Sequence, residues 1–414
     1  MNKNIFDAKI HKLENELNLI SIKKDSQLSS IHIGIKVGSI NEKANDRGIS
    51  HFIEHMLFKG TSNFNNEELN DYLEQRGGEY NAYTDYSCTV FSITALAEEL
   101  EPSISILADM IQNSIFPEKE IERERGVILA EIRTSKDDIE DYSFKRANEV
   151  AFTRSSLKYD TLGEEKTVKR FNKEQILDYY NKYYIPNNSF ITIASPYNHD
   201  EILNMVSTYF SSWKKKELKE DVAVIENNTA KKVVSYKKDI EQSTIVYVFT
   251  FHGLNKQEEL ALKILNHKFG ESANSILFRE LREEKGLAYD VYSQMDITSN
   301  VKTLYIYTAV SEDKIEEAIS SINDSIGRIK TGEANFNENT VMLMKKVLKT
   351  AVAATMEDST DLGNYALHQS MDNESIYEFL EDMENLELIK SIDLYKVANK
   401  VFNKPTIHIL KSEI

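Results

Sequence analysis

The sequence has few of the residues that indicate disulfide bonds, disorder or membrane insertion. Its 414 residues include one cysteine, Cys88, which excludes an internal disulfide and a metal site built from several cysteines. Five prolines leave little room for a long disordered tract. No stretch approaches the ~18–20 apolar residues of a membrane span, and the first residues lack the apolar core of a signal peptide. We therefore expect a cytoplasmic protein without a membrane span, in which histidine and carboxylate groups hold any metal.

Basic residues are also outnumbered. The chain has 50 Lys and Arg against 67 Asp and Glu, which gives a formal net charge of −17. Because like charge repels the phosphate backbone, nucleic acid is not an expected partner. The acidity fits either a protein that its charge keeps soluble or one with an acidic substrate chamber, and the composition leaves both open.

The length and the hydrophobic pattern predict two similar α+β domains. The chain exceeds the ~250–300 residues at which a single core stops growing. In the first half, residues 31–37 alternate like a strand, residues 53–57 and 69–73 have helical spacing, and residues 78–96 are typical of one long strand or a bent pair. The second half repeats this order of elements without repeating the sequence, which indicates a degenerate duplication.

The expected fold is an antiparallel or mixed β-sheet in each domain, with helices packed on one face. We place the first domain at residues 1–215 and the second at residues 233–414. Residues 216–232 are charged and polar with few apolar side chains, which suits an exposed linker.

A short helical motif in the first domain carries the strongest chemical signal. His51, Glu54 and His55 stand at positions i, i+3 and i+4, so on a helix their side chains share one face. Two imidazoles four residues apart suit a tetrahedral zinc ion, and a glutamate beside them can act as a general base. The competing interpretation is a helix with two solvated histidines and a glutamate.

A catalytic zinc ion usually has three protein ligands, so a third is required. The segment that Pro117 opens offers Glu124 and Glu131, seven residues apart on one helical face. They lie ~10 Å apart along the helix axis and cannot both bind one ion. One would be a ligand, and the other would accept a hydrogen bond from the ring of a ligand histidine. Helical geometry leaves open which is which.

Three separated segments in the first half resemble those of the pitrilysin-type inverzincins, in particular the shorter bacterial members related to mitochondrial processing peptidase. The segments are GSINEKANDRGISHFIEHMLFKGT (38–61), RGGEYNAYT (76–84) and ERERGVILAEI (122–132). A fourth match, LFRELREEKGLAY (277–289), lies in the second half, so the resemblance covers nearly the whole chain.

The resemblance implies a set of site residues. It implies one zinc ion per chain with His51, His55 and Glu131 as ligands, Glu54 as the base, and Glu124 as the carboxylate behind a ligand histidine. This assignment decides between the two glutamates that helical geometry leaves open.

The resemblance also implies that Arg282 and Tyr289 reach the active site from the second domain. A guanidinium and a phenol can each donate a hydrogen bond to a developing oxyanion. From the residues alone, a surface ion pair of Arg282 with Glu283 or Glu284 and a buried strand start at Tyr289 are the simpler interpretations.

By the same resemblance, Asn81, Ala82 and Tyr83 belong to an edge strand that binds an extended peptide through its main chain. Packing in the core is the alternative for Tyr83. Two departures from the family pattern concern substrate preference: Ser87 stands where a glutamate is common, and the glycine-rich loop is reduced to FGES at 269–272.

The function that follows is a zinc metalloendopeptidase that hydrolyses unfolded peptides inside a chamber. Family members of this length usually pair, so we expect a homodimer, with a heterodimer of related chains as the alternative. A dedicated maturation protease that trims one leader or bacteriocin-like peptide is a second interpretation. A third is a structural subunit with the same fold and no activity.

Overall fold

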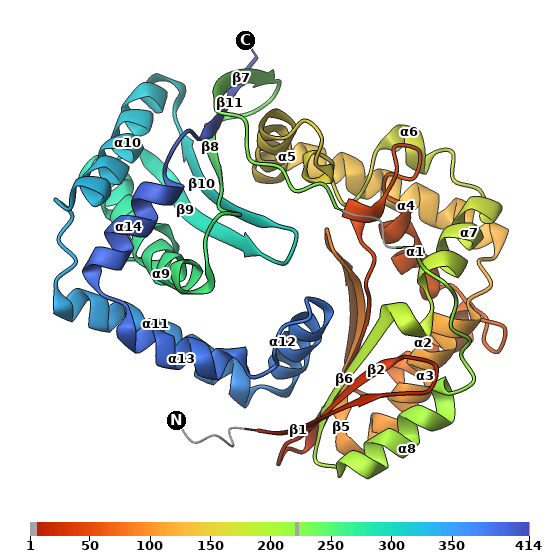
Figure 1. Ribbon diagram of the computed structural model, residues 1–414. Helices are drawn as coiled ribbons and strands as arrows, with labels where there is room; N and C mark the ends of the chain where they lie inside the picture. The colour runs from red at the N-terminus through yellow and green to blue at the C-terminus, as the bar shows by residue number, and fades with distance from the viewer. Residues whose placement is uncertain (1–5, 220–222, 414) are drawn as a thin grey trace. The chain divides into compact units, whose positions relative to one another are not determined.

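A computed structural model describes residues 6–219 and 223–413 (Figure 1). These residues form two compact units, each assembled from three segments of the chain. Unit 1 comprises the described residues of 1–133, 160–223 and 353–378. Unit 2 comprises those of 134–159, 224–352 and 379–414.

Unit 1 is built on a six-stranded sheet in the order β1-β2-β6-β3-β5-β4. Strands β2 and β6 pair in parallel, and the other neighbours pair antiparallel. The strands are β1 Asp7–Lys12, β2 Asn18–Lys23, β3 Leu28–Ile35, β4 Glu79–Thr84, β5 Thr89–Leu96 and β6 Ser189–Ser195. The principal helices are α1 Ile49–Leu57, α2 Asn66–Glu74, α3 Leu100–Asn113, α4 Glu118–Asp137, α6 Glu165–Val168, α7 Lys173–Tyr183, α8 His199–Phe210 and α12 Ser359–Met371.

Unit 2 has a five-stranded sheet in the order β7-β11-β8-β10-β9. Its strands are β7 Lys231–Lys237, β8 Ser243–Thr250, β9 Ala288–Ile297, β10 Lys302–Val310 and β11 Thr406–Ser412. Its longer helices are α5 Ile139–Ala151, α9 Lys256–Asn266, α10 Ile315–Thr331, α11 Glu338–Glu357, which ends in unit 1, α13 Glu378–Leu388 and α14 Ser391–Val401. Two π-helical turns, His267–Glu271 and Phe278–Glu284, lie between α9 and β9.

The two sheets share one topology. Strands β7, β11, β8, β10 and β9 follow each other in the same order as β2, β6, β3, β5 and β4, with one parallel pair at the same place. The mixed-sheet α+β class is confirmed, and this shared order is what a duplication would produce. The segment at 78–96 is a β4–β5 hairpin and not a single long strand.

The prediction that helices cover only one face of each sheet is wrong. In β3 the apolar side chains of Ile31 and Ile33 face the main core, as their spacing predicts. The opposite face of β3 is also buried, because α12 packs on β3 and β6. Gly34 permits this approach, since a Cβ there would lie 2.9 Å from the sulfur of Met371. The residues on that face are small or polar, so the sequence pattern predicts that the face is exposed to solvent.

Each half of the chain supplies the helix that covers the second face of the other half's sheet. Helix α12 comes from the second half and packs on the sheet of unit 1, whereas α5 comes from the first half and packs on β8 and β11 of unit 2. Both helices begin after an aspartate, Asp138 or Asp358, whose carboxylate accepts two backbone N–H groups. The duplication therefore extends to these helices and their caps.

This exchange changes the description of the domains. After the last strand of the first sheet, the chain passes from unit 1 to unit 2 between residues 223 and 224. This point lies inside the expected linker at 216–232. Residues 220–222 of that segment lie outside the described residues. Segments 134–159 and 353–378 join the unit opposite to their half of the chain, so the units are not two contiguous stretches. No helix of the described residues is both long and apolar enough to cross a membrane.

The start of α1, the helix of the histidine motif, depends on contact between two glycines. Gly48, the N-cap, has φ of 90°, and Gly163 has φ of 82°, both in the left-handed region. A Cβ on Gly163 would lie 2.4 Å from the Cα of Gly48, and one on Gly48 would lie 2.6 Å from the carbonyl oxygen of Leu162. The two backbones can approach this closely only without side chains.

We expect Gly163→Ala to lower the free energy of unfolding by about 2 kcal/mol or more, because the added methyl overlaps the Gly48 backbone. The matched control is Gly126→Ala in α4, where a Cβ meets nothing within 4 Å. Alanine there should raise the free energy of unfolding by about 0.5–1 kcal/mol. Urea denaturation of both variants measures the difference, and equal stability of Gly163→Ala and the parent would contradict the contact.

Candidate metal centre

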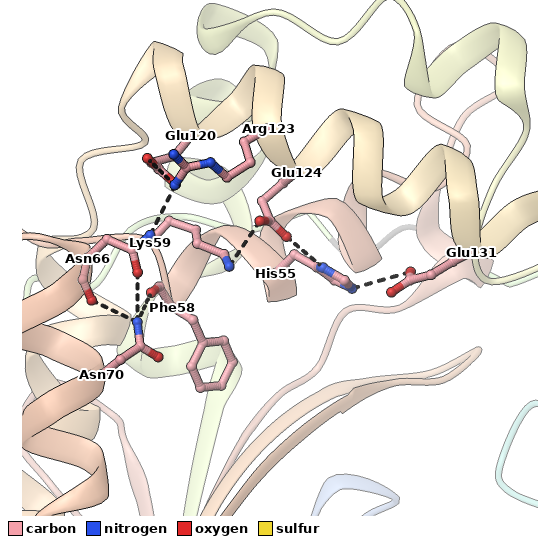
Figure 2. Close-up of polar contacts among 9 residues, drawn as sticks. All are labelled: His55, Phe58, Lys59, Asn66, Asn70, Glu120, Arg123, Glu124 and Glu131. Atoms are coloured by element: carbon pink, nitrogen blue, oxygen red, sulfur yellow. Dashed lines mark hydrogen bonds and ion pairs between the residues drawn. The ribbon is translucent and has the colours of Figure 1, made fainter.

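Helices α1 and α4 bring together the three side chains that the sequence suggests as ligands. His51 and His55 project from one face of α1, and Glu131 comes from α4. The Nε2 atoms of the two histidines lie 3.2 Å apart. The Oε2 atom of Glu131 lies 3.6 Å from Nε2 of His55 and 3.9 Å from Nε2 of His51. Figure 2 shows the approach of Glu131 to His55.

The geometry of these groups fits a tetrahedral zinc ion. Two nitrogens bound to one such ion lie ~3.3 Å apart, close to the separation of the two Nε2 atoms. Within the described residues, neither Oε2 of Glu131 nor Nδ1 of His51 has a hydrogen-bond partner, although both atoms are buried. Buried acceptors without a partner are rare in folded proteins, and a cation bound by Glu131 would satisfy its oxygen.

Glu124 supports the centre from behind His55. Its Oε2 atom lies 3.1 Å from Nδ1 of His55, and its Oε1 atom accepts a hydrogen bond from Nζ of Lys59 at 2.9 Å. Figure 2 shows Lys59, Glu124, His55 and Glu131 in one row across the two helices. A carboxylate on Nδ1 keeps the proton there and leaves the lone pair on Nε2, which points to Glu131.

Glu54, the predicted base, is buried beside the ligands. The hydroxyl of Thr84 on β4 donates to its Oε2 atom at 2.7 Å. Burial is the main cause that raises the pKa of Glu54, with a contribution from Glu131, while Thr84 and His55 act in the opposite direction. A raised pKa makes this carboxylate a stronger proton acceptor than an exposed glutamate.

The charges around the histidines favour a cation. Burial, and then the neighbouring His55, lower the pKa of His51 to about 3, so this ring is neutral and its lone pair is available. Burial also acts to lower the pKa of His55, but the hydrogen bond to Glu124 and the charges of Glu131 and Glu54 outweigh it and raise the pKa. Three carboxylates thus face two imidazoles, with Lys59 as a nearby positive charge.

Comparison with known proteins places this geometry in a family. Residues 19–165 match the family profile described as Insulinase (Peptidase family M16), and residues 170–343 match the one described as Peptidase M16 inactive domain. A protein from Rickettsia felis named uncharacterized zinc protease is 31% identical over 411 residues, which are 96% of this chain and 95% of that protein. The chain belongs to peptidase family M16.

M16 membership confirms the family expected from the motifs, and two further comparisons show a related sequence and the same fold. The beta subunit of mitochondrial-processing peptidase from Bos taurus is 34% identical over 209 residues, 50% of this chain and 42% of that subunit. A protease from Helicobacter pylori of known structure has the same fold, with a TM-score of 0.92 at 21% identity over 98% of this chain and all of that one.

The second half of this M16 chain lacks the carboxylates of the first. Helix α11 begins at Glu338, 220 residues after α4 begins at Glu118. The helices that follow them, α12 at Ser359 and α5 at Ile139, are also 220 residues apart. With that offset, Met344 and Ala351 stand where α4 has Glu124 and Glu131. This difference gives a physical reason for the word "inactive" in the name of the family profile that matches residues 170–343.

Strand β4, which the M16 resemblance implies for substrate binding, lies at the edge of its sheet, and among the described residues it pairs only with β5. Asn81 is exposed there, and its side-chain oxygen accepts from the backbone N–H of Ala82 at 2.9 Å. Tyr83 points toward α12, where its hydroxyl donates to Asn364 at 2.8 Å and lies 2.7 Å from Nε2 of His368. The packing interpretation of the Tyr83 side chain is the one that the structure supports.

Arg282 and Tyr289 lie in unit 2 and contact each other. The guanidinium carbon of Arg282 lies 5.3 Å from the centre of the Tyr289 ring and 5.0 Å from that of Phe278. Tyr289 is 74% exposed, so it does not begin a buried strand. Glu284 pairs with Arg279 at 3.7 Å, and no ion pair of Arg282 with Glu283 or Glu284 is found among the described residues. The interpretation of Tyr289 as the start of a buried strand is therefore wrong, and Arg282 lies over two aromatic rings.

The two departures from the family pattern have local explanations. The backbone N–H of Ser87 donates to Oδ1 of Asp85 at 2.5 Å, which holds Ser87 in the β4–β5 turn. In the segment 269–272, a Cβ on Gly270 would lie 2.6 Å from the backbone nitrogen of Ser293, so this glycine is needed for packing against β9. Neither departure removes a candidate ligand or the candidate base.

Three residues beside the centre are absent from the sequence-based site. Thr84 contacts Glu54, and Lys59 contacts Glu124. Glu42 accepts the backbone N–H groups of Gly48 at 2.8 Å and Ser50 at 2.9 Å and so caps the start of α1. Lys59 stands four residues after His55, a spacing that could have pointed to it. Thr84 acts across a tertiary contact, and Glu42 acts from the loop before α1, so neither has a helical spacing signal in the sequence.

We expect Glu124→Gln to weaken zinc binding by about 10–100-fold, because the ring of His55 loses the negative charge behind Nδ1. The control is Glu122→Gln, an exposed position on the same helix, which should leave the affinity unchanged. Competition with a chromogenic chelator measures both. Equal affinity of the Glu124→Gln variant and the parent would contradict the assigned role of Glu124.

Proposed function

We propose that this chain is a zinc endopeptidase that hydrolyses unfolded peptides. The observation that carries the proposal is the convergence of His51, His55 and Glu131 within 3.2–3.9 Å, with Glu54 buried beside them. These three side chains would hold one zinc ion per chain. The relatives named zinc proteases support the choice of metal.

A bound zinc ion supplies Lewis acidity and lowers the pKa of water in its coordination sphere. Glu54 would accept a proton from the attacking water and later deliver it to the leaving amine. Its raised pKa suits both transfers. Thr84 holds one carboxylate oxygen, so the proton moves at a carboxyl group of fixed orientation. Glu124 keeps the ring of His55 in position during these steps.

The edge strand β4 is proposed to bind the substrate. An extended peptide can add to its free side by main-chain hydrogen bonds, which requires an unfolded segment and reads little of its sequence. Ala82 would supply such bonds through its backbone, because its N–H bonds to the side chain of Asn81 and not to β5. Asn81 would release that N–H to the peptide, while Tyr83 anchors the strand to α12. Thr84, at the end of the same strand, contacts the base, so binding and chemistry share one strand.

Further parts of the proposal concern the second unit and the assembly. Arg282 and Tyr289 would donate hydrogen bonds to the peptide carbonyl oxygen as negative charge develops on it. Their mutual stacking and the exposure of Tyr289 keep both groups available for this task. We also propose that two chains pair to enclose a chamber that admits only unfolded peptides, and that the enzyme works in the cytoplasm. A heterodimer with a related chain is the alternative assembly.

We expect Glu54→Gln to lower the rate of peptide hydrolysis by about 10²–10⁴-fold while the zinc content stays that of the parent, because the amide cannot accept a proton. His55→Ala should lose both zinc and activity. Cleavage of a mixed peptide library followed by mass spectrometry measures the activity, and metal analysis measures the zinc. Cut sites throughout the library would support a general peptidase, and one dominant site a maturation protease.

The hydrolase proposal is wrong if Glu54→Gln cleaves at the parental rate, or if purified protein retains no stoichiometric zinc. If the chain is instead a structural subunit without activity, neither the parent nor the Glu54→Gln variant should cleave any peptide.

A further inference from the structure

A second group of metal-ligand side chains lies where the turn between β4 and β5 meets α12. An oxygen of Asp85, the sulfur of Cys88 and one ring nitrogen of His368 lie within 4.8 Å of one another. All three residues belong to unit 1, and none of them belongs to the candidate zinc centre. The sequence separates His368 from the turn by 280 residues, so only the fold brings them together.

The turn holds two of the three groups at the separation that a metal requires. Oδ1 of Asp85 accepts the backbone N–H groups of Ser87 at 2.5 Å and Cys88 at 2.7 Å, which fixes the carboxylate. The second oxygen, Oδ2, then lies 3.5 Å from the sulfur of Cys88. A sulfur and a carboxylate oxygen bound to one tetrahedral zinc ion are ~3.5 Å apart. These two side chains would therefore need little rearrangement.

The third group is held by the strand that leads into the turn. The hydroxyl of Tyr83 lies 2.7 Å from Nε2 of His368 and donates to Asn364 one turn earlier on α12. The Tyr83 and His368 rings are nearly parallel, with centroids 6.3 Å apart. Both sides of the group are thus preorganised, one by the turn and the other by the Tyr83 contact.

The charges at this place also suit a cation. Cys88 is almost fully buried, and burial together with the charges of Asp85 and Asp372 raises the pKa of its thiol well above the ordinary value. Asp372 stands four residues after His368, on the same side of the helix end. A divalent ion would neutralise these carboxylates and would replace the thiol proton.

We propose that Asp85, Cys88 and His368 bind a divalent cation of the zinc or cobalt type. A mixed set of sulfur, nitrogen and oxygen donors suits such borderline metals, whereas calcium and magnesium require oxygen ligands. The ion would join α12, which the second half of the chain supplies, to the hairpin of the first sheet. The composition led us to expect metal ligands among histidine and carboxylate groups alone. This proposal adds the one cysteine of the chain to them.

The test is a titration of the reduced, metal-free full-length protein with Co²⁺ under anaerobic conditions. Because Cys88 is the only cysteine, a thiolate-to-cobalt charge-transfer band in the near ultraviolet can arise from this site alone. We expect the parent to bind two equivalents of Co²⁺ and to show the band. Cys88→Ser should bind one equivalent and lose the band.

Two variants separate this site from the zinc centre and from a folding defect. His55→Ala disables the zinc centre and should bind one equivalent with the band intact. His368→Gln leaves the cysteine in place and should weaken the Co²⁺ affinity that the band reports by about tenfold or more. Circular dichroism of each variant checks its fold. If Cys88→Ser does not fold, His55→Ala and His368→Gln still decide the question.

The proposal is overturned if the parent shows no charge-transfer band, or if His368→Gln binds Co²⁺ with the parental affinity and band. Two equivalents bound by a folded Cys88→Ser variant would also overturn it, because the second ion would then lie elsewhere.

Discussion

The contact between Glu124 on α4 and the ring of His55 on α1 is the interaction on which the candidate centre depends. It holds the two helices in register, so that Glu131, two turns further along α4, arrives beside the Nε2 atoms of both histidines. Lys59 occupies the other oxygen of Glu124, which prevents that carboxylate from swinging toward the centre. The supporting glutamate and the ligand glutamate differ in role because only one of them has a partner on each oxygen.

The same helix pair connects the centre to the way in which the chain is duplicated. Helix α4 leads directly into α5, which covers the sheet of unit 2, and the corresponding α11 leads into α12, which covers the sheet of unit 1. Each sheet buries both faces by means of this exchange, so neither half of the chain has a complete core alone. Helix α12 in turn anchors β4 through Tyr83, and β4 ends at Thr84, which contacts the candidate base. A segment of the second half thus supports unit 1 without contributing a candidate ligand to the metal centre.

Features that depend on local periodicity could be predicted from the sequence. The shared face of His51, Glu54 and His55 follows from helical spacing alone, and the strand at Ile31 and Ile33 follows from alternation. The choice between Glu124 and Glu131 could not be made from spacing, because both lie on one helical face. The family resemblance assigns Glu131 as the ligand, and the contacts of Glu124 with His55 and Lys59 explain this assignment. The second buried face of β3 escaped because Ser30, His32 and Gly34 look like solvent-facing residues, and helical amphipathicity does not say which sheet a helix covers. The proximity of Cys88 and His368 has no sequence signal, because it arises only when α12 of the second half packs on the sheet of unit 1.

The most direct test of the central claim is a crystal structure of the zinc-loaded protein with anomalous diffraction data at the zinc absorption edge. The account predicts an anomalous peak within ~2.0–2.2 Å of Nε2 of His51, Nε2 of His55 and a carboxylate oxygen of Glu131, with Glu124 still bonded to Nδ1 of His55. A map without a peak between these three groups, or a zinc ion bound by Glu124 in place of Glu131, would contradict it.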